Sequence, residues 1–263
     1  MEMSQLEQSF ELARAENRAL LIGYLPAGFP TLERSISTVK AMIEGGVDVI
    51  EVGLPYSDPV MDGPVIQQAS ETALTNGFKT GDVFKVVAAS PAPTLVMSYW
   101  NPIERFGVAA FANELKKVGG EGVITPDLTI EESEYWISST DEERLHRVYV
   151  VAPSTTDNRL TEVSARCSGF IYAASLMGVT GARTDISTAA QALVERIKKV
   201  SKTPVCVGLG VSTGAQAREI AKFADGVIVG SAFIKLIIES NSESEANLKV
   251  RSLATELAAA VRR

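Results

Sequence analysis

The feature that most constrains the fold is the alternation of short apolar runs with longer segments of helical character. Eight runs are rich in apolar and β-branched residues and are bounded by Gly, Pro or polar residues, at positions 19–25, 49–53, 94–98, 122–125, 147–151, 170–174, 205–209 and 226–230. Runs of this kind are typical of strands that are buried on both faces of a sheet. The sequence therefore predicts eight such strands.

The segments between these runs carry helix signals. Thr31 precedes the segment 32–44 as a capping residue, and Gly45 follows it as a stop. The segment FGVAAFANELKKVGG ends in lysines and a glycine pair, which is also typical of a helix end. Apolar residues recur at helical spacing in 186–200 and 213–223, and further helices are expected at both ends of the chain, in 4–16 and 244–263.

Strand–helix alternation repeated eight times predicts a parallel sheet, and eight such units close into a (β/α)8 TIM barrel. The alternative is an open doubly wound sheet, which would favour G-x-G-x-x-G after the first strand, where this chain has GYLPAGFP. No Gly/Ser-rich or Pro-rich linker divides the sequence. We therefore expect one barrel domain over residues 1–263, with extra N-terminal and C-terminal helices.

Charge and hydropathy exclude several function classes. The formal net charge is −7, whereas a nucleic-acid binder would show a basic face. The first residues carry acids where a secretory signal would carry positive charge, and no apolar run approaches ~20 residues, so we expect no membrane segment. Cys167 and Cys206 lie outside any metal or redox spacing, which favours buried thiols in a reducing compartment. We expect a cytoplasmic protein.

The residue types available for chemistry are few. His146 is the only histidine, and it stands at the start of an apolar run, the end of a strand that lies opposite a barrel's active face. A structural role is therefore expected for it, and no cluster of His, Asp and Glu suggests a metal site. Acid–base catalysis would then be carried out by carboxylates, Tyr, Lys or Cys.

Glu51 is the most unusual residue of the strands, because it places a carboxyl group inside the apolar run VDVIEVGL. Val49, Glu51 and Gly53 alternate with residues of the opposite face and point to one side. If that side is the barrel interior, burial would raise the pKa of Glu51 and let it donate and accept protons near neutral pH. The alternative is a buried Glu that bonds a neighbouring strand.

Asp58 and Asp62 follow the same strand in a proline-bounded loop, YSDPVMDGP. Aspartates beside prolines commonly cap turns, and a shared divalent cation with Glu51 is a further, weaker alternative. Elsewhere, SLMGVTGART, GLGVST and GSA follow the last three strands and are rich in Gly and small hydroxyl residues. Backbone N–H groups in such loops bind anions, and barrels frequently hold phosphate after strands 7 and 8. Single glycines of this kind can also simply make tight turns.

Four of these stretches together resemble one known family. EVGLPYSDPVMDGP, AASLMGVTGA, VGLGVS and VIVGSA are similar to the signature stretches of the tryptophan synthase alpha subunit, in the same order, over a region from about Leu21 to Ile238. The resemblance implies a lyase of tryptophan biosynthesis that cleaves indole-3-glycerol phosphate to indole and glyceraldehyde 3-phosphate. It also implies a beta-subunit partner in an alpha2beta2 heterotetramer, with pyridoxal phosphate only in that partner and no cofactor in this chain.

The resemblance also implies roles for individual residues. The acid/base glutamate of the family falls on Glu51, and the aspartate that faces the indole ring falls on Asp62. Asp58 and Pro59 match the loop that faces the beta subunit, and the remaining matches are substrate-binding: Tyr172 beside the glutamate, Thr180 in a mobile loop, and Gly181, Gly210, Gly230 and Ser231 at the phosphate. We expect 176–187 to be a lid that is disordered in the empty enzyme and orders over the site.

The chain departs from the family pattern at Val60-Met61, Leu176-Met177 and Phe29, which changes loop contacts and removes no catalytic group. A Schiff-base aldolase is disfavoured, because no lysine falls inside a predicted strand. The enzymatic alternative is another phosphate-binding barrel, such as a sugar-phosphate isomerase or epimerase. A non-catalytic subunit that only activates a beta chain is the alternative from another class, although such a relic is expected to have lost Glu51 or Asp62.

Overall fold

The computed structural model describes residues 3–174, 183–208 and 210–263. Its eight strands pair in sequence order and in parallel, and the first pairs with the last, so the sheet closes into a barrel. The strands are β1 (Leu20–Pro26), β2 (Val49–Gly53), β3 (Thr94–Met97), β4 (Gly122–Thr125), β5 (His146–Val151), β6 (Ile171–Ala174), β7 (Val205–Gly208) and β8 (Gly226–Val229). The predicted (β/α)8 fold and all eight predicted strands are confirmed.

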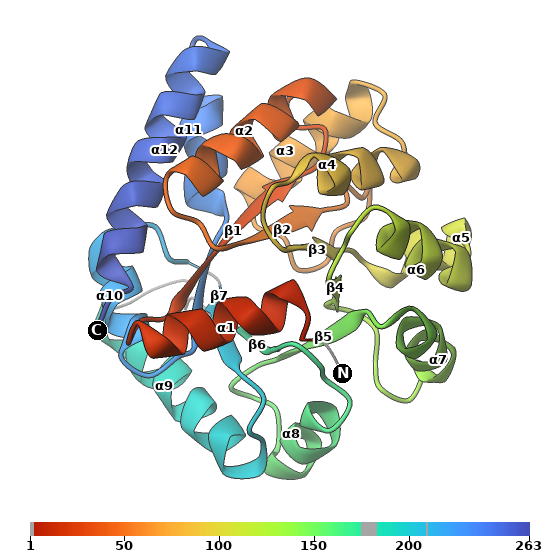
Figure 1. Cartoon of the computed structure of the whole chain (residues 1–263), viewed down its shortest axis with the longest axis vertical. Coiled ribbons are helices and arrows are strands. Elements are labelled where there is room, and N and C mark those ends of the chain that lie inside the picture. Colours follow the sequence, from red (N-terminus) through yellow and green to blue (C-terminus); the bar gives the residue numbers. More distant parts are fainter. Residues whose placement is uncertain (1–2, 175–182, 209) are drawn as a thin grey trace.

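Helices accompany the strands, and most of them surround the barrel on its outside, as Figure 1 shows. They are α1 (Gln5–Ala15), α2 (Leu32–Glu44), α3 (Pro64–Thr75), α4 (Val83–Ala89), α5 (Trp100–Phe106), α6 (Val108–Lys117), α7 (Glu134–Glu143), α8 (Asp157–Ser164), α9 (Arg183–Val200), α10 (Gly214–Ala221), α11 (Ser231–Ile238) and α12 (Glu243–Ala260), with a short 3-10 helix at Thr80–Asp82. Within the described ranges, none of these helices combines the length and apolarity that crossing a bilayer requires.

The side chains of the strands divide into two apolar layers. Those that point outward pack with the surrounding helices, for example Leu21, Ile50 and Val52. Those that point inward fill the barrel, for example Leu20 and Val49. This division follows from the period of two along a strand, and it explains why the runs read as continuously apolar.

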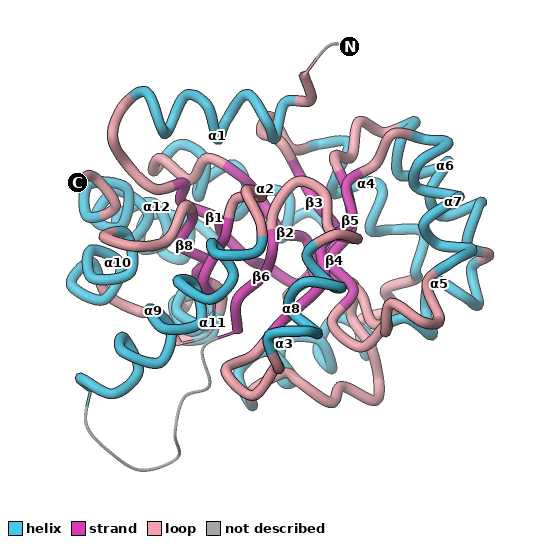
Figure 2. Tube along the Cα trace, turned by 90° about the horizontal axis from the view of Figure 1, so that it is seen from below, coloured by secondary structure: helices cyan, strands magenta, loops and turns pink. Residues whose placement is uncertain are grey.

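Helix α1 closes one end of the barrel. Figures 1 and 2 show it lying across that end, on the side opposite the loops that follow the strands. Leu6, Phe10 and Ala13 of α1 belong to the same cluster as the inward side chains of the strands, and the Phe10 ring meets that of Phe170 at a tilt of 56°, with ring centroids 6.3 Å apart. Only the other end of the barrel is therefore left for a substrate.

His146 lies at this closed end. It is the first residue of β5, and its Nε2 is 2.9 Å from the Oγ of Ser4, the residue that caps α1. Burial is the main reason that the pKa of His146 falls below its usual value. The structure therefore places His146 as the sequence predicts, at the opposite end from the substrate loops, where it connects β5 to α1.

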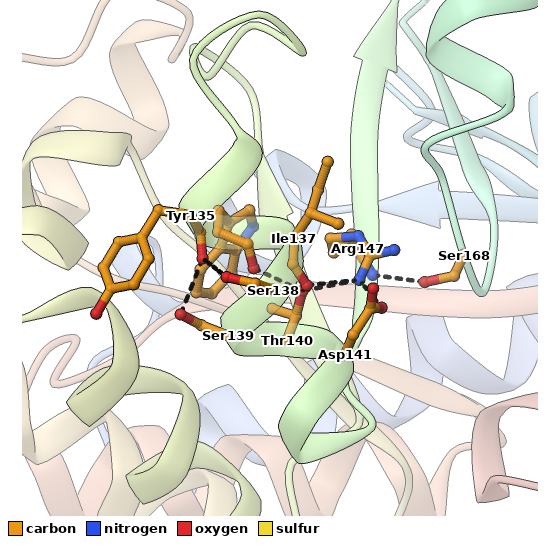
Figure 3. A network of polar contacts seen from close by, with 9 residues as sticks. Tyr135, Ile137, Ser138, Ser139, Thr140, Asp141, Arg147 and Ser168 are labelled. Carbon is orange, nitrogen blue, oxygen red and sulfur yellow. Dashed lines mark hydrogen bonds and ion pairs between the residues drawn. The ribbon is translucent and has the colours of Figure 1, made fainter.

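A network of polar contacts joins β5 to the neighbouring helix α7 (Figure 3). One guanidinium nitrogen of Arg147 donates to Thr140 Oγ1 at 2.8 Å and to the Ile137 carbonyl at 3.4 Å, and it also pairs with the Asp141 carboxylate. The backbone N–H of Arg147 donates to Ser168 Oγ at 2.9 Å. Because the arginine head is mostly covered, these bonds hold the helix against the strand in one register.

Helix α12 completes the outer layer by packing on α2. Asn247 donates to Ser37 Oγ at 2.6 Å, and its carbonyl oxygen lies 3.2 Å from Thr38 Oγ1. A Cβ at Gly45 would come within 2.4 Å of the Ala254 methyl group, so the two helices meet closely where α2 ends. The C-terminal helix thus covers the part of the wall beside the junction of β1 and β8.

Truncation of Phe10 tests the closing role of α1. Phe10→Ala is expected to lower the free energy of unfolding by about 3–5 kcal/mol, because it leaves a cavity between α1 and the barrel interior. Leu12→Ala on the exposed face of the same helix is the matched control, with an expected change within about 0.5 kcal/mol. Urea unfolding measures both, and equal losses in the two variants would show that α1 does not seal the barrel.

Candidate active site

Glu51 points into the barrel near its open end. Val49 on the same strand belongs to the inward cluster, whereas Ile50 and Val52 belong to the outer one, so the alternation places Glu51 on the inner face. Its Cα pairs with Tyr24 of β1 on one side and with Leu95 of β3 on the other. The carboxyl group is fully buried.

The Glu51 carboxyl group stands in an unusual electrostatic environment. Neither carboxylate oxygen has a hydrogen-bond partner among the described residues. Burial raises the pKa of Glu51 to about 8, so the group is mostly protonated at neutral pH. A carboxyl group with a pKa near the working pH can deliver a proton and take one back, which an exposed Glu does poorly.

Asp62 lies in the loop after β2 and is held by Tyr99. The backbone N–H of Met61 donates to the Tyr99 hydroxyl at 2.9 Å, which leaves the hydroxyl proton for the Asp62 carboxylate. Burial raises the pKa of Asp62, and the hydrogen bond from Tyr99 opposes that rise. Burial likewise raises the pKa of Tyr99, to about 12, so its hydroxyl remains a donor.

One pocket brings both acids together at the open end of the barrel. The space between its walls measures about 660 Å³ including its open mouth. The lining residues are Tyr24, Glu51, Met61, Asp62, Ile66, Met97, Val150, Tyr172, Ala174, Gly210, Ile228, Gly230 and Ser231. The walls are thus mostly apolar, and their carboxyl groups come from β2 and the loop that follows it.

The part of the pocket that follows β7 and β8 carries backbone groups suited to an anion. Gly210 follows β7 with φ of +84°, a conformation that favours glycine. Gly230 is the N-cap residue of α11, and Ser231 is its first residue. The N-terminus of α11 therefore opens toward the pocket, where free N–H groups and the helix dipole favour a phosphate.

The predicted site residues fall into three groups. Six of them line this one pocket: Glu51, Asp62, Tyr172, Gly210, Gly230 and Ser231. Asp58 is exposed and Pro59 is partly exposed in the β2–α3 loop, and neither lines the pocket. Thr180 and Gly181 lie outside the described residues, as do Leu176 and Met177.

The expected lid, 176–187, is partly corrected by the structure. Residues 175–182 lie outside the described part, so that portion of the prediction stays a prediction. Residues 183–187, however, already belong to helix α9, which was expected to begin only at Ile186. The reason is that extending an existing helix by a turn costs much less than nucleating one, so a helix can begin before its apolar periodicity does.

Several lining residues were not singled out by the sequence analysis. Tyr24 occupies the inward position two residues beyond Ile22, and Met97 and Val150 are inward residues near the ends of β3 and β5. Alternation along each strand would have revealed these three. Tyr99 lies beyond the end of β3, and no pattern in the sequence shows that its hydroxyl meets the loop after β2.

Metal-assisted chemistry finds no support in the arrangement of ligands. Among the residues that the structure describes, no group of three His, Cys, Asp or Glu side chains could hold a metal ion. Asp58 does not line the pocket with Glu51 and Asp62, so the three acids are not brought together as a cation site would require.

Comparison with known proteins agrees with this geometry over nearly the whole chain. The family model described as tryptophan synthase alpha chain matches residues 10–262. This chain belongs to the tryptophan synthase alpha chain family. A curated alpha chain from Thermobifida fusca is 53% identical to it, over 99% of this chain and 98% of the relative, and one from Streptomyces coelicolor is 52% identical over 98% and 96%.

Solved structures of the family have the same fold. A Mycobacterium tuberculosis tryptophan synthase structure superposes with a TM-score of 0.92 and 49% identity, covering 100% of both chains. As a member of the family, the chain is a carbon–carbon lyase of tryptophan biosynthesis. Its alpha reaction cleaves indole-3-glycerol phosphate to indole and glyceraldehyde 3-phosphate.

The burial of Glu51 predicts a pH-dependent stability. The group ionises near pH 4.5 in the unfolded chain and near pH 8 in the folded one. The contribution of the buried, protonated carboxyl group to the free energy of unfolding is therefore fully present below about pH 4.5. It is lost as the pH rises to about 8, because the unfolded chain releases this proton more readily than the folded one. Glu51→Gln, which cannot ionise, is expected to be more stable than the wild type at pH 8, by a few kcal/mol on the order of the shift, and similar to it near pH 4.

Urea unfolding of both proteins at the two pH values measures this difference. Glu71→Gln on the exposed surface of α3 is the control and should show no comparable dependence. A wild type that matches Glu51→Gln at pH 8 would mean that the carboxyl group of Glu51 is not desolvated in solution.

Proposed function

We propose that Glu51 is the proton shuttle of the alpha reaction. Cleavage with indole as the leaving group needs a proton delivered to indole C3 and another removed from the hydroxyl on the adjacent chain carbon. The single observation that carries this assignment is the buried, unpartnered carboxyl group whose pKa lies at about 8, in the wall of the pocket that the described residues form. Such a group can serve as acid and then as base within one turnover.

Asp62 is assigned the electrostatic role. When C3 is protonated, positive charge spreads over the indole toward its ring N–H, and a fixed carboxylate there stabilises that charge. Asp62 suits this role because it faces the same pocket as Glu51 and because the Tyr99 hydroxyl bonds its carboxylate. The apolar walls fit the flat indole ring, which a sugar-phosphate isomerase or epimerase would not require.

The phosphate is assigned to the side of the pocket formed by Gly210, Gly230 and Ser231. Tyr172 lies within the barrel beside the substrate, and Thr180 and Gly181 are assigned to the lid and the phosphate by family resemblance alone. These assignments place the phosphate near the ends of β7 and β8 and the indole near the acids of β2 and its loop, with the three-carbon chain between them.

The partner proposed for this chain is a tryptophan synthase beta subunit, in an alpha2beta2 heterotetramer. Asp58 and Pro59 stand outside the pocket on the β2–α3 loop, where a partner can reach them. Pyridoxal phosphate is assigned to that partner and no cofactor to this chain. Closure of the remaining predicted lid, 176–182, is the proposed means by which the partner raises the alpha rate, through the adjoining loop.

Two further assignments concern the whole chain. Residues 1–263 are proposed to act as one domain, because the barrel closes between β1 and β8 and both terminal helices pack on it. The proposed location is the cytoplasm, which the two free thiols, Cys167 and Cys206, support.

Substitution of the two acids tests the division of roles. Glu51→Gln is expected to abolish indole release while the barrel still folds, because Glu51 is the residue proposed to shuttle the proton and an amide cannot replace it. Asp62→Asn is expected to retain more activity than Glu51→Gln, since it loses electrostatic stabilisation and keeps the acid. Indole release from indole-3-glycerol phosphate measures both variants, and full activity in Glu51→Gln would overturn the mechanism. Absence of indole release by the wild type would instead favour the non-catalytic alternative.

The phosphate side predicts an asymmetry between adding and removing a side chain. Gly210→Val is expected to weaken glycerol 3-phosphate binding strongly, because it crowds the pocket wall and strains a backbone with φ of +84°. Ser231→Ala is expected to cost only about 0.5–1.5 kcal/mol, one hydrogen bond, because the backbone donors remain. Calorimetry measures both, and equal small losses would place the phosphate elsewhere.

A further inference from the structure

Tyr24 shares the pocket with the two acids. Its Cα pairs with that of Glu51 across the β1–β2 ladder, and it follows the inward-facing residues Leu20 and Ile22 at a spacing of two. The side chain is almost completely buried, and it lines the pocket. Tyr24 therefore projects into the same part of the site as Glu51.

The position of the Tyr24 ring follows from the two glycines beside it. A Cβ on Gly53 would come within 2.3 Å of the Tyr24 hydroxyl oxygen, and a Cβ on Gly230 within 2.9 Å of the ring atom Cδ1. Gly53 ends β2, and Gly230 is the N-cap residue of α11. The ring thus extends along the wall from the phosphate side of the pocket toward the acids, and its hydroxyl lies at the acid side.

The hydroxyl of Tyr24 has no acceptor among the residues that the structure describes. Tyr24 lines the pocket, and no described residue hydrogen-bonds to its hydroxyl. Burial first, and then the nearby Asp62 and Glu51 carboxylates, raise the pKa of Tyr24 well above its usual value, so the proton stays on the oxygen. A hydroxyl that lines a pocket and has no protein acceptor can donate to a bound ligand.

We propose that Tyr24 is a specificity-determining residue whose hydroxyl donates a hydrogen bond to a hydroxyl oxygen on the three-carbon chain of the substrate. The inference rests on the proposed roles of Glu51, Asp62 and the phosphate side. With the phosphate at Gly230 and the reacting carbon at Glu51, the chain between them runs along the Tyr24 ring. The only polar group of the indole ring is its N–H, which is assigned to Asp62. Because an N–H is a donor, it cannot accept a hydrogen bond from the Tyr24 hydroxyl. The hydroxyl oxygens of the three-carbon chain can accept that bond.

Tyr24→Phe tests the proposal, because it removes the hydroxyl and keeps the ring that fills the space beside the glycines. Calorimetry would compare two ligands: glycerol 3-phosphate, which carries the chain hydroxyls, and indole-3-propyl phosphate, which has none. The variant is expected to bind glycerol 3-phosphate about 3- to 10-fold more weakly, the value of one hydrogen bond, and indole-3-propyl phosphate within about twofold of the wild type. The kcat/KM for indole-3-glycerol phosphate is expected to fall by a similar factor.

Tyr149→Phe is the matched control. Tyr149 carries another buried tyrosine hydroxyl, but it alternates with the inward residues Val148 and Val150 of β5, so it points outward and does not line the pocket. This control should leave both affinities unchanged. If Tyr24→Phe loses the same affinity for both ligands, Tyr24 has only a packing role. If it loses affinity for neither, the three-carbon chain of the substrate lies elsewhere. Either outcome overturns the inference. If the wild type releases no indole, the proposed roles of Glu51, Asp62 and the phosphate side are themselves wrong. This result can be distinguished from a failure of the inference on Tyr24 alone.

Discussion

Burial of every strand on both faces is the constraint on which the rest of the structure depends. A closed parallel barrel leaves no sheet edge, its outer face is covered by helices, and its interior is packed with side chains. Polar groups can then meet solvent or a ligand only at the two ends. Helix α1 occupies one of those ends, so the chemistry is confined to the loops and strand termini of the other (Figure 2).

The same constraint sets the properties of the acids. Glu51 sits two positions before the end of β2, where burial is complete, whereas Asp62 lies beyond the strand in a loop that brings it a hydroxyl donor. Two carboxyl groups that face one pocket therefore receive different environments, and burial dominates at Glu51 while a hydrogen bond opposes burial at Asp62. Such a difference allows one acid to carry a proton and the other a charge.

Much of this arrangement was predictable from the sequence, for identifiable reasons. A period of two places Glu51 on the inner face of β2 once the strand is recognised, and the family motifs point to Asp62, Gly210, Gly230 and Ser231, all of which line the pocket. The Tyr99 contact was not predictable, because a hydrogen bond between two loops depends on how the strands bring them together. The start of α9 was misjudged because helix ends depend on backbone propagation more than on apolar pattern.

The close contacts of Tyr24 with Gly53 and Gly230 have a consequence for how this sequence can diverge. Each glycine supplies space that the aromatic ring already occupies, so a larger residue at either position collides with the ring. Substitutions at these three positions are therefore not independent: a smaller side chain at position 24 would have to accompany any side chain gained at 53 or 230. In a collection of homologous sequences, this would appear as covariation between a strand residue and the ends of both neighbouring strands, even though only one of the three residues has a side chain.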